Sequence, residues 1–226
     1  MRCTRWLTAS VGIALLGLAA AGPAAAGSAA DADRLVREIY YEGMPADQAE
    51  TLDADGIAHL RSLLQDPEER ALHGNAVLAL GMSGHADAFP VLAAFGRRAP
   101  SGEIDRDTFR ARLRLAQAMG HLARTDPRAL HWLLARADRP PRPPAWRFRH
   151  HQGPRLAQLL EEQVLTGLAL SGADQAHERL RRAEQRAGSA DTPGERRRRH
   201  AAHALQTHRR VADGGRPDPH GPGVAR

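Results

Sequence analysis

Val77-Leu-Ala-Leu-Gly-Met-Ser-Gly84 and Leu165-Thr-Gly-Leu-Ala-Leu-Ser-Gly172 are two copies of one short pattern. A third, shorter copy, Ala118-Met119-Gly120, lies between them. Residues 81, 120 and 169 occupy equivalent positions in the three copies, and they are 39 and 49 residues apart. A period near 40 residues with two helices in each unit is typical of an α-solenoid. The sequence therefore predicts an all-α fold, a short right-handed α-solenoid of about three to four helical hairpins.

Apolar residues recur every three to four positions along most of the chain, which is the spacing of amphipathic helices. The expected helices cover residues 32–42, 55–66, 72–80, 88–95, 109–120, 129–134, 156–168, 176–183 and 195–211. Small residues in the repeated pattern allow the two antiparallel helices of a hairpin to approach closely. Gly84 and Gly172 are placed to end helices in the left-handed conformation.

Between residues 66 and 92 the chain carries small, apolar and turn-forming residues in a fixed order: Asp66-Pro67, Ala76, Ala79-Leu80-Gly81, Gly84, Ala88 and Leu92. This run resembles a HEAT repeat, closest to the short bacterial type that is also found in phycobilisome-lyase-like proteins. The resemblance covers about residues 55–187. It implies a curved binding scaffold, usually for proteins and sometimes for nucleic acid, and it implies no reaction.

The chain departs from the family pattern at two places. Family repeats often carry an arginine in the middle of the first helix, where His73 stands here. The Asp-Pro signal of the second unit is displaced to Asp126-Pro127, between its two helices. These departures leave the number of repeats open by about one.

The first residues have the three parts of a secretory signal peptide. Arg2 and Arg5 supply positive charge, Leu7–Ala21 is apolar, and small residues allow cleavage after Ala26. The apolar stretch is too short for a comfortable membrane span. We therefore expect an exported protein, periplasmic or secreted, with residues 1–26 removed; the alternative is an uncleaved anchor.

The rest of the chain divides into four parts. We expect an N-terminal helix and linker at 27–54, HEAT-like repeats at 55–187, a basic terminal helix at 188–212 and a disordered tail at 213–226. A Pro/Arg-rich loop at 139–155 interrupts the repeats.

Composition excludes several kinds of chemistry. All 32 basic residues are arginine, so Schiff-base and P-loop lysine chemistry are excluded. The single cysteine, Cys3, lies in the predicted signal peptide, which excludes a thiol nucleophile, a disulfide and a cysteine metal site in the mature chain. No acid, base and orienting residue form a recognisable set. We expect a protein that is not an enzyme and needs no cofactor.

Charge is distributed unevenly along the chain. Residues 27–100 carry 6 arginines against 12 acidic residues, and residues 101–226 carry 24 arginines against 14. This division predicts either an anionic partner for the C-terminal half or head-to-tail self-association.

The 139–155 loop is the main candidate binding site because it breaks the repeat period. Insertions in solenoids often lie on the binding face. Trp146 and Phe148 are the expected anchors, Arg147 and Arg149 the expected contacts to an anionic group, and His150 and His151 adjoin them. In the alternative, the two aromatic side chains fold back to cap the core and leave the arginines solvated.

Two further groups of residues, one of arginines and one of histidines, stand in the last predicted helix. Arg197 and Arg198 belong to a basic run at the start of the last helix, which either contacts an acidic surface or membrane or is a solvated helix end. His200 and His203 share one helix face, but no third ligand has a fixed spacing to them, so no metal site is predicted. His208 is expected to be packed.

The leading prediction is an exported, non-enzymatic HEAT-repeat scaffold that mediates a protein–protein interaction. The alternative is binding of an anionic polymer or membrane surface through the arginine-rich C-terminal half.

Overall fold

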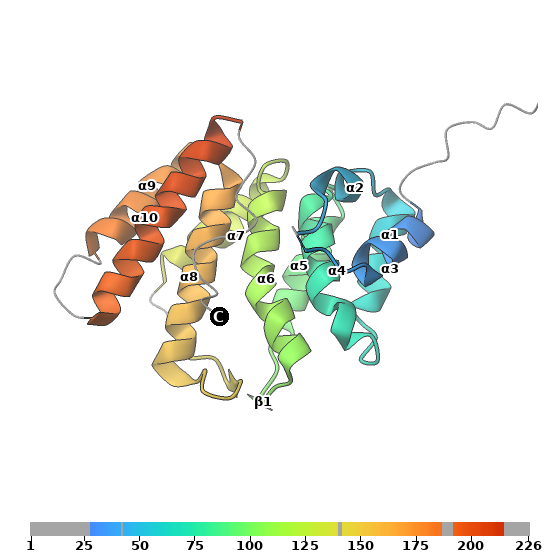
Figure 1. Cartoon of the computed structure of the whole chain (residues 1–226), viewed down its shortest axis with the longest axis horizontal. Coiled ribbons are helices and arrows are strands. Elements are labelled where there is room, and N and C mark those ends of the chain that lie inside the picture. Colours follow the sequence, from blue (N-terminus) through green and yellow to red (C-terminus); the bar gives the residue numbers. More distant parts are fainter. Residues whose placement is uncertain (1–27, 42, 140–141, 187–191, 215–226) are drawn as a thin grey trace, which may run out of the picture.

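The structure is a computed structural model that describes residues 28–41, 43–139, 142–186 and 192–214, with side chains for 28–41, 43–139, 142–185 and 198–214. The helices within these ranges are α1 (Ala29–Arg37), α2 (Ala46–Glu50), α3 (Ala54–Leu63), α4 (Arg70–Met82), α5 (Ala88–Arg97), α6 (Arg106–Leu122), α7 (Pro127–Ala137), α8 (Gly153–Ser171), α9 (Asp174–Arg186) and α10 (Thr192–Ala212). Strands β1 (Gly102–Glu103) and β2 (Trp146–Arg147) form one short parallel pair. The fold is all-α, as predicted, and its helices pack in sequential order (Figure 1).

Helices α4, α6, α8 and α10 lie side by side and run in the same direction, and we call them the parallel layer (Figure 1). Contacts between neighbours follow the same order along both helices: Gly74 with Ala111 and Gly81 with Ala118, Gln117 with Gln163 and Gly120 with Gly167, Thr166 with His200 and Ala173 with His208. Helices α5, α7 and α9 each pack against the layer helix that precedes them and the one that follows. Successive hairpins are therefore joined through the parallel layer.

The repeated glycines lie where the helices of this layer meet. A Cβ atom on Gly81 would overlap the backbone of Ala118, and one on Gly120 would overlap the backbone of Gly167. The expectation that small residues bring together the two antiparallel helices of one hairpin is therefore wrong. They bring together parallel helices of successive hairpins, because the glycines face the next layer helix.

Two glycines after layer helices adopt the predicted left-handed conformation. Gly84 and Gly172 both have φ 64°. Gly84 follows α4, and its carbonyl accepts a hydrogen bond from Thr125 Oγ1 at 3.2 Å, which joins the turn after α4 to the turn after α6.

The helix boundaries differ from the predicted ones in a few places. The first helix ends at Arg37 rather than residue 42, because the backbone becomes extended at Glu38. Helix α4 does not end before Gly81 but continues through it to Met82. Gly81 is needed for close packing on α6 and does not end the helix. The five-residue α2 and the paired strands were not predicted.

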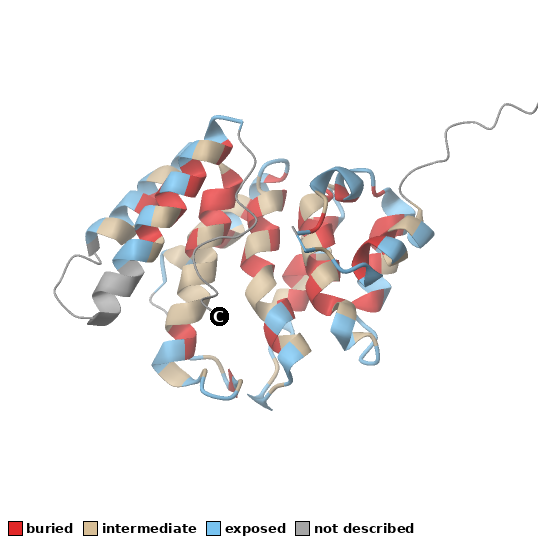
Figure 2. Cartoon of the chain, viewed as in Figure 1, coloured by how far each residue is buried: buried red, intermediate tan, exposed pale blue. Residues whose placement is uncertain are grey.

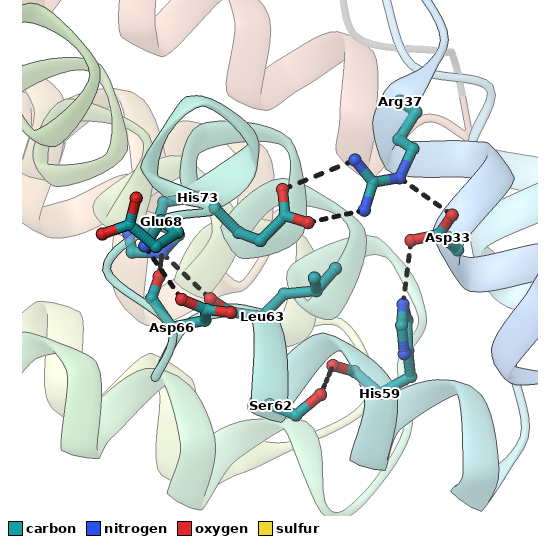
Figure 3. Close-up of polar contacts among 9 residues, drawn as sticks. Asp33, Arg37, His59, Ser62, Leu63, Asp66, Glu68 and His73 are labelled. Carbon is teal, nitrogen blue, oxygen red and sulfur yellow. Dashed lines mark hydrogen bonds and ion pairs between the residues drawn. The ribbon is translucent and has the colours of Figure 1, made fainter.

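A network of polar contacts fixes the N-terminal helices (Figure 3). Arg37 lies 2.9 Å from Asp33 and 2.8 Å from Glu69, which immediately precedes α4. His59 of α3 lies 3.1 Å from the same Asp33. His73 Nε2 donates to the carbonyls of Leu63 and Asp66 at 2.9 and 3.0 Å. Contacts from α1 to α3 and α4, and from α4 back to the end of α3, therefore hold these three helices together.

Buried residues gather where successive helices face each other (Figure 2). The main core runs from α1 to α10 and includes fully buried side chains such as Leu60, Leu80, Met119 and Leu168. A second, smaller core contains Phe109, Trp146 and Leu156. Within the described ranges no helix combines the length and the apolar character needed to cross a membrane.

Candidate functional site

The described part of the predicted 139–155 loop that lies before α8, residues 142–152, is fixed to the segment that precedes α6. The Gly102 N–H donates to the carbonyl of Ala145 at 3.1 Å, and the Ile104 N–H donates to the carbonyl of Arg147 at 3.0 Å. These two bonds make the β1–β2 pair. They place Trp146 and the residues after it beside the first turn of α6.

Trp146 is directed into the protein. Its side chain is only 6% exposed and meets Phe109 edge-on, with ring centroids 6.2 Å apart. Of the two alternatives for Trp146, the structure shows the one in which the side chain folds back on the core, so the prediction that Trp146 anchors a partner is corrected: its indole completes the second core. Residues from α6 and α8 surround the indole, and burying it there removes a large apolar surface from water.

A tight turn follows, formed by residues 148–151, which we call the aromatic turn. Phe148 and His151 exchange two backbone hydrogen bonds, at 3.0 and 2.8 Å. Both rings stack on Phe109, with centroid separations of 4.4 Å for Phe148 and 5.3 Å for His151. Phe148 is half-buried, so it belongs partly to the second core and partly to the surface.

Arg149 occupies the tip of the aromatic turn in a strained conformation. Its φ is 49°, and no other non-glycine residue in the described part of the chain has a positive φ. Such a backbone is costly for a residue with a side chain and persists only where surrounding contacts impose it. The guanidinium lies 5.2 Å from the centre of the Phe148 ring and remains exposed. The fold thus holds the exposed Arg149 guanidinium over the Phe148 ring.

The histidines of the turn differ in their environment. His150 is exposed at the tip. Burial lowers the pKa of His151, and the nearby charges of Arg155 and His150 lower it further. The neutral imidazole is therefore favoured, which suits a ring stacked on Phe109.

The other basic candidates are not gathered at the turn. Arg147 is exposed and lies 3.4 Å from the exposed Glu103, a pair that contributes little to stability. Arg198 is exposed on α10, and among the described residues no hydrogen bond or ion pair joins it to the turn. The side chain of Arg197 lies outside the described residues. The structure brings together Phe148, Arg149, His150 and His151.

The three histidines of α10 have separate hydrogen-bonding partners. His200 Nε2 donates to the carbonyl of Glu162 at 2.8 Å, and His203 lies 3.3 Å from Thr207. His208 is buried, as predicted, and donates to the carbonyl of Ala173. Across the part of the chain that the structure describes, no three His, Cys, Asp or Glu residues form a group suited to a metal ion.

Sequence reasoning missed a groove between α3 and α5. It has a volume of about 280 Å³, and its apolar lining includes Ile57, Leu64, Val91 and Phe95. These residues belong to the same three-to-four spacing that indicated the helices. Periodicity identifies an apolar helix face, but it does not distinguish a face covered by a neighbour from one left open.

The chain was also compared with known proteins. Neither the family models, nor the curated proteins, nor the solved structures gave a match to it.

Proposed function

We propose that this protein is an exported, non-enzymatic scaffold of HEAT-like hairpins, arranged as a short right-handed α-solenoid, that binds a protein partner through the aromatic turn. The observation that carries the proposal is Arg149, an exposed cation held at φ 49° on the Phe148 ring. Strained residues concentrate at functional sites, where surrounding structure over-determines them.

The packing of the chain supports the scaffold part of the proposal. Four helices run parallel in one layer, and each connecting helix packs on the layer helix before it and the one after it. A stack of this kind gives a rigid support on which a loop is presented. The signal-like N-terminus, which supports export, lies outside the described residues.

The chemistry of the turn suits a carboxylate beside an apolar group on a partner. Arg149 offers a planar set of donors, and half-buried Phe148 offers an aromatic face next to it. Because two backbone bonds and two ring stacks already order the turn, binding loses little conformational entropy there.

The test replaces Arg149 with glycine. Glycine adopts positive φ without strain, so Arg149→Gly keeps the backbone of the turn and removes the arginine side chain. Arg182→Ala on α9 is the control, since it removes another exposed arginine, one that pairs with Glu178 away from the turn. A Trp146→Ala change is unsuitable because emptying the second core costs about 3–5 kcal/mol and confuses folding with binding.

The measurement is affinity capture from an extracytoplasmic extract at about 0.05 and about 0.5 M salt. We expect one discrete protein to remain bound at the higher salt concentration. Arg149→Gly should weaken its affinity at least about tenfold, equivalent to about 1.4 kcal/mol, while Arg182→Ala leaves it unchanged. Equal affinity for wild type and Arg149→Gly would refute the assignment of the turn.

One observation favours a second function, binding of an anionic polymer or membrane surface. Arg139, Arg142, Arg149 and Arg155 are exposed, and within the described ranges none of them forms an ion pair. This function predicts that material elutes as salt rises, with no single protein enriched. Binding to dextran sulfate would then decline steeply with salt.

A further inference from the structure

The groove between α3 and α5 runs along one face of both helices. Its lining residues recur every three to four positions, from Ala54 to Gln65 along α3 and from Asp87 to Arg98 along α5. At 1.5 Å per residue the groove is about 15 Å long. Ile57, Leu64 and Phe95 lie buried in its floor, so its middle is apolar.

Helices α3 and α5 end on the same side of the molecule. His73, in the first turn of α4, contacts both ends. Its Nε2 donates to the carbonyl of Leu63 at 2.9 Å, and its ring meets Phe95 edge-on with centroids 6.5 Å apart (Figure 3). This end of the groove is lined by Arg61 and Arg98, and we call it the basic end.

The two arginines of the basic end have no ion-pair partner among the described residues. Arg34, Arg37 and Arg70, which also belong to the acidic N-terminal half of the chain, all form ion pairs. Arg61 and Arg98 form none, although both side chains are exposed. The groove therefore carries two uncompensated guanidiniums.

The need to stabilise helix ends does not account for these two charges. Cations are favoured near the last carbonyls of a helix. In α5 this position is taken by Arg112, which donates to the carbonyl of Phe95 at 2.7 Å and also to that of Arg98. In α3 the carbonyl of Leu63 accepts its hydrogen bond from His73. The guanidiniums of the basic end are thus free to contact a ligand.

The opposite end of the groove carries negative charge. Asp87 immediately precedes α5 and lines the groove there. Its side chain is 71% exposed, and its contact with His85 is long, at 3.8 Å. Along its length the groove therefore changes from negative, through apolar, to positive.

An amphipathic helix has the complementary pattern. Acidic side chains are favoured in the first turn of a helix and basic ones in the last, and apolar side chains line one face between them. A helix antiparallel to α3 and α5 brings its first turn to the basic end and its last turn to Asp87. The groove volume of about 280 Å³ is at the lower limit for a small-molecule pocket, and it suits a few side chains of such a helix.

We propose that the α3–α5 groove binds an amphipathic helix of a partner protein, antiparallel to α3 and α5. The apolar side chains of the partner helix pack on Ile57, Val91 and Phe95, and its first-turn carboxylates pair with Arg61 and Arg98. None of the residues of the aromatic turn lines this groove, so the inference goes beyond the proposed function. The contact area is small, and we expect a dissociation constant of about 10–100 μM.

The probe is a fluorescently labelled peptide of about 15 residues, the length at which isolated helices become stable in water. It carries glutamates in its first turn, leucines at every third or fourth position and arginines in its last turn. A control peptide has the same composition and the same charged turns, but its leucines are moved off the helical spacing. Fluorescence anisotropy measures the affinity of each peptide for the purified protein.

Two variants alter the groove. Ala58→Glu places a carboxylate beside its apolar floor, and Arg98→Glu reverses one charge of the basic end. Both residues are exposed, so both variants should fold with unchanged melting temperatures. Arg97→Glu is the matched control, because it makes the same charge change at an exposed neighbour of Arg98 that does not line the groove.

We expect wild type, Arg97→Glu and Arg149→Gly to bind the peptide equally well. Ala58→Glu and Arg98→Glu should weaken binding at least about tenfold. A peptide whose first-turn glutamates are replaced by arginines should bind Arg98→Glu more tightly than it binds wild type. That exchange of charges tests the direction of the bound helix, because only its first turn meets the basic end.

The proposal would be overturned by wild type that does not bind the peptide at about 1 mM, or by equal affinity for the control peptide. It would also be overturned by groove variants that bind like wild type, or by tighter binding of the original peptide to Arg98→Glu. Each of these results leaves the proposed function standing, since that function is tested at Arg149.

Discussion

At the scale of single residues, the two glycines Gly74 and Gly81 make a sharp comparison. A Cβ on Gly81 would overlap the backbone of Ala118, whereas one on Gly74 would meet the Arg114 side chain at an ordinary 3.4 Å. Gly81→Ala should lower the free energy of unfolding by about 1–3 kcal/mol or more, because backbones must separate.

Gly74→Ala serves as the control in the same helix. Alanine is favoured over glycine in helix interiors by about 1 kcal/mol, so this variant should be as stable as wild type or more so. Urea unfolding followed by circular dichroism measures both. If the two variants lose equal stability, the close approach of α4 and α6 is not what requires glycine at Gly81.

Another residue-scale prediction concerns His121 in the last turn of α6. Burial, and secondly the charge of Arg124, lower the pKa of His121 to about 4. Between pH about 6.5 and about 4 the unfolded chain binds a proton at this site that the folded protein does not bind. The free energy of unfolding therefore decreases as the pH is lowered across that window.

The expected loss is up to about 3 kcal/mol, and it should be complete below pH about 4. His121→Gln should flatten the dependence of unfolding free energy on pH between these limits. The carboxylates Asp33, Asp105 and Asp126, whose pKa values are lowered in the folded state, act below this window. An unchanged slope in His121→Gln would contradict the assignment.

At the scale of elements, α7 depends on its first residues. Asp126 accepts a hydrogen bond from the Arg128 N–H at 2.9 Å, and its carboxylate pairs with the Arg128 guanidinium at 2.7 Å. Arg128 also donates to the carbonyl of Ala86 at 2.9 Å, which joins α7 to the turn before α5. Asp126 is 7% exposed, so water does not replace these bonds.

Asp126→Ala should therefore lower the free energy of unfolding by about 1–2 kcal/mol. Asp126→Asn keeps the N-cap and loses only the charge, and it should retain most of the stability. Thermal unfolding of the two variants near neutral pH separates the contributions. Equal losses would mean that the Arg128 ion pair, rather than the cap, stabilises the start of α7.

The sequence was most informative about the positions of single helices. Helices with strong apolar spacing, such as 88–95 and 109–120, were located because their buried residues recur on one face. Strands of two residues are too short to show an alternating apolar pattern in the sequence. They pair only because the loop folds against residues 102–104. Whether Trp146 anchors a partner or folds back on the core stayed open for the same reason: its burial depends on a second core that Phe109 of α6 and Leu156 of α8 form with it.

At the scale of the whole molecule, the packing is sequential, and this determines where the chain opens first. Helix α6 packs on α4, α5, α7 and α8, whereas α1 and α10 each have neighbours on one side of the molecule (Figure 1). Hydrogen exchange should show the greatest amide protection in α6 and less protection toward both ends. Mass spectrometry of exchanged peptides tests this order, and a maximum in α1 or α10 would contradict it.

The contacts at the layer glycines have a mechanical consequence. If a partner pulls on one end of the parallel layer while the other end is held, tension passes between hairpins across the α4–α6 junction at Gly81 and the α6–α8 junction where Gly120 meets Gly167. Backbones in direct contact have no flexible side chains between them to absorb displacement. The molecule should therefore be stiff under small loads and yield one junction at a time under larger ones.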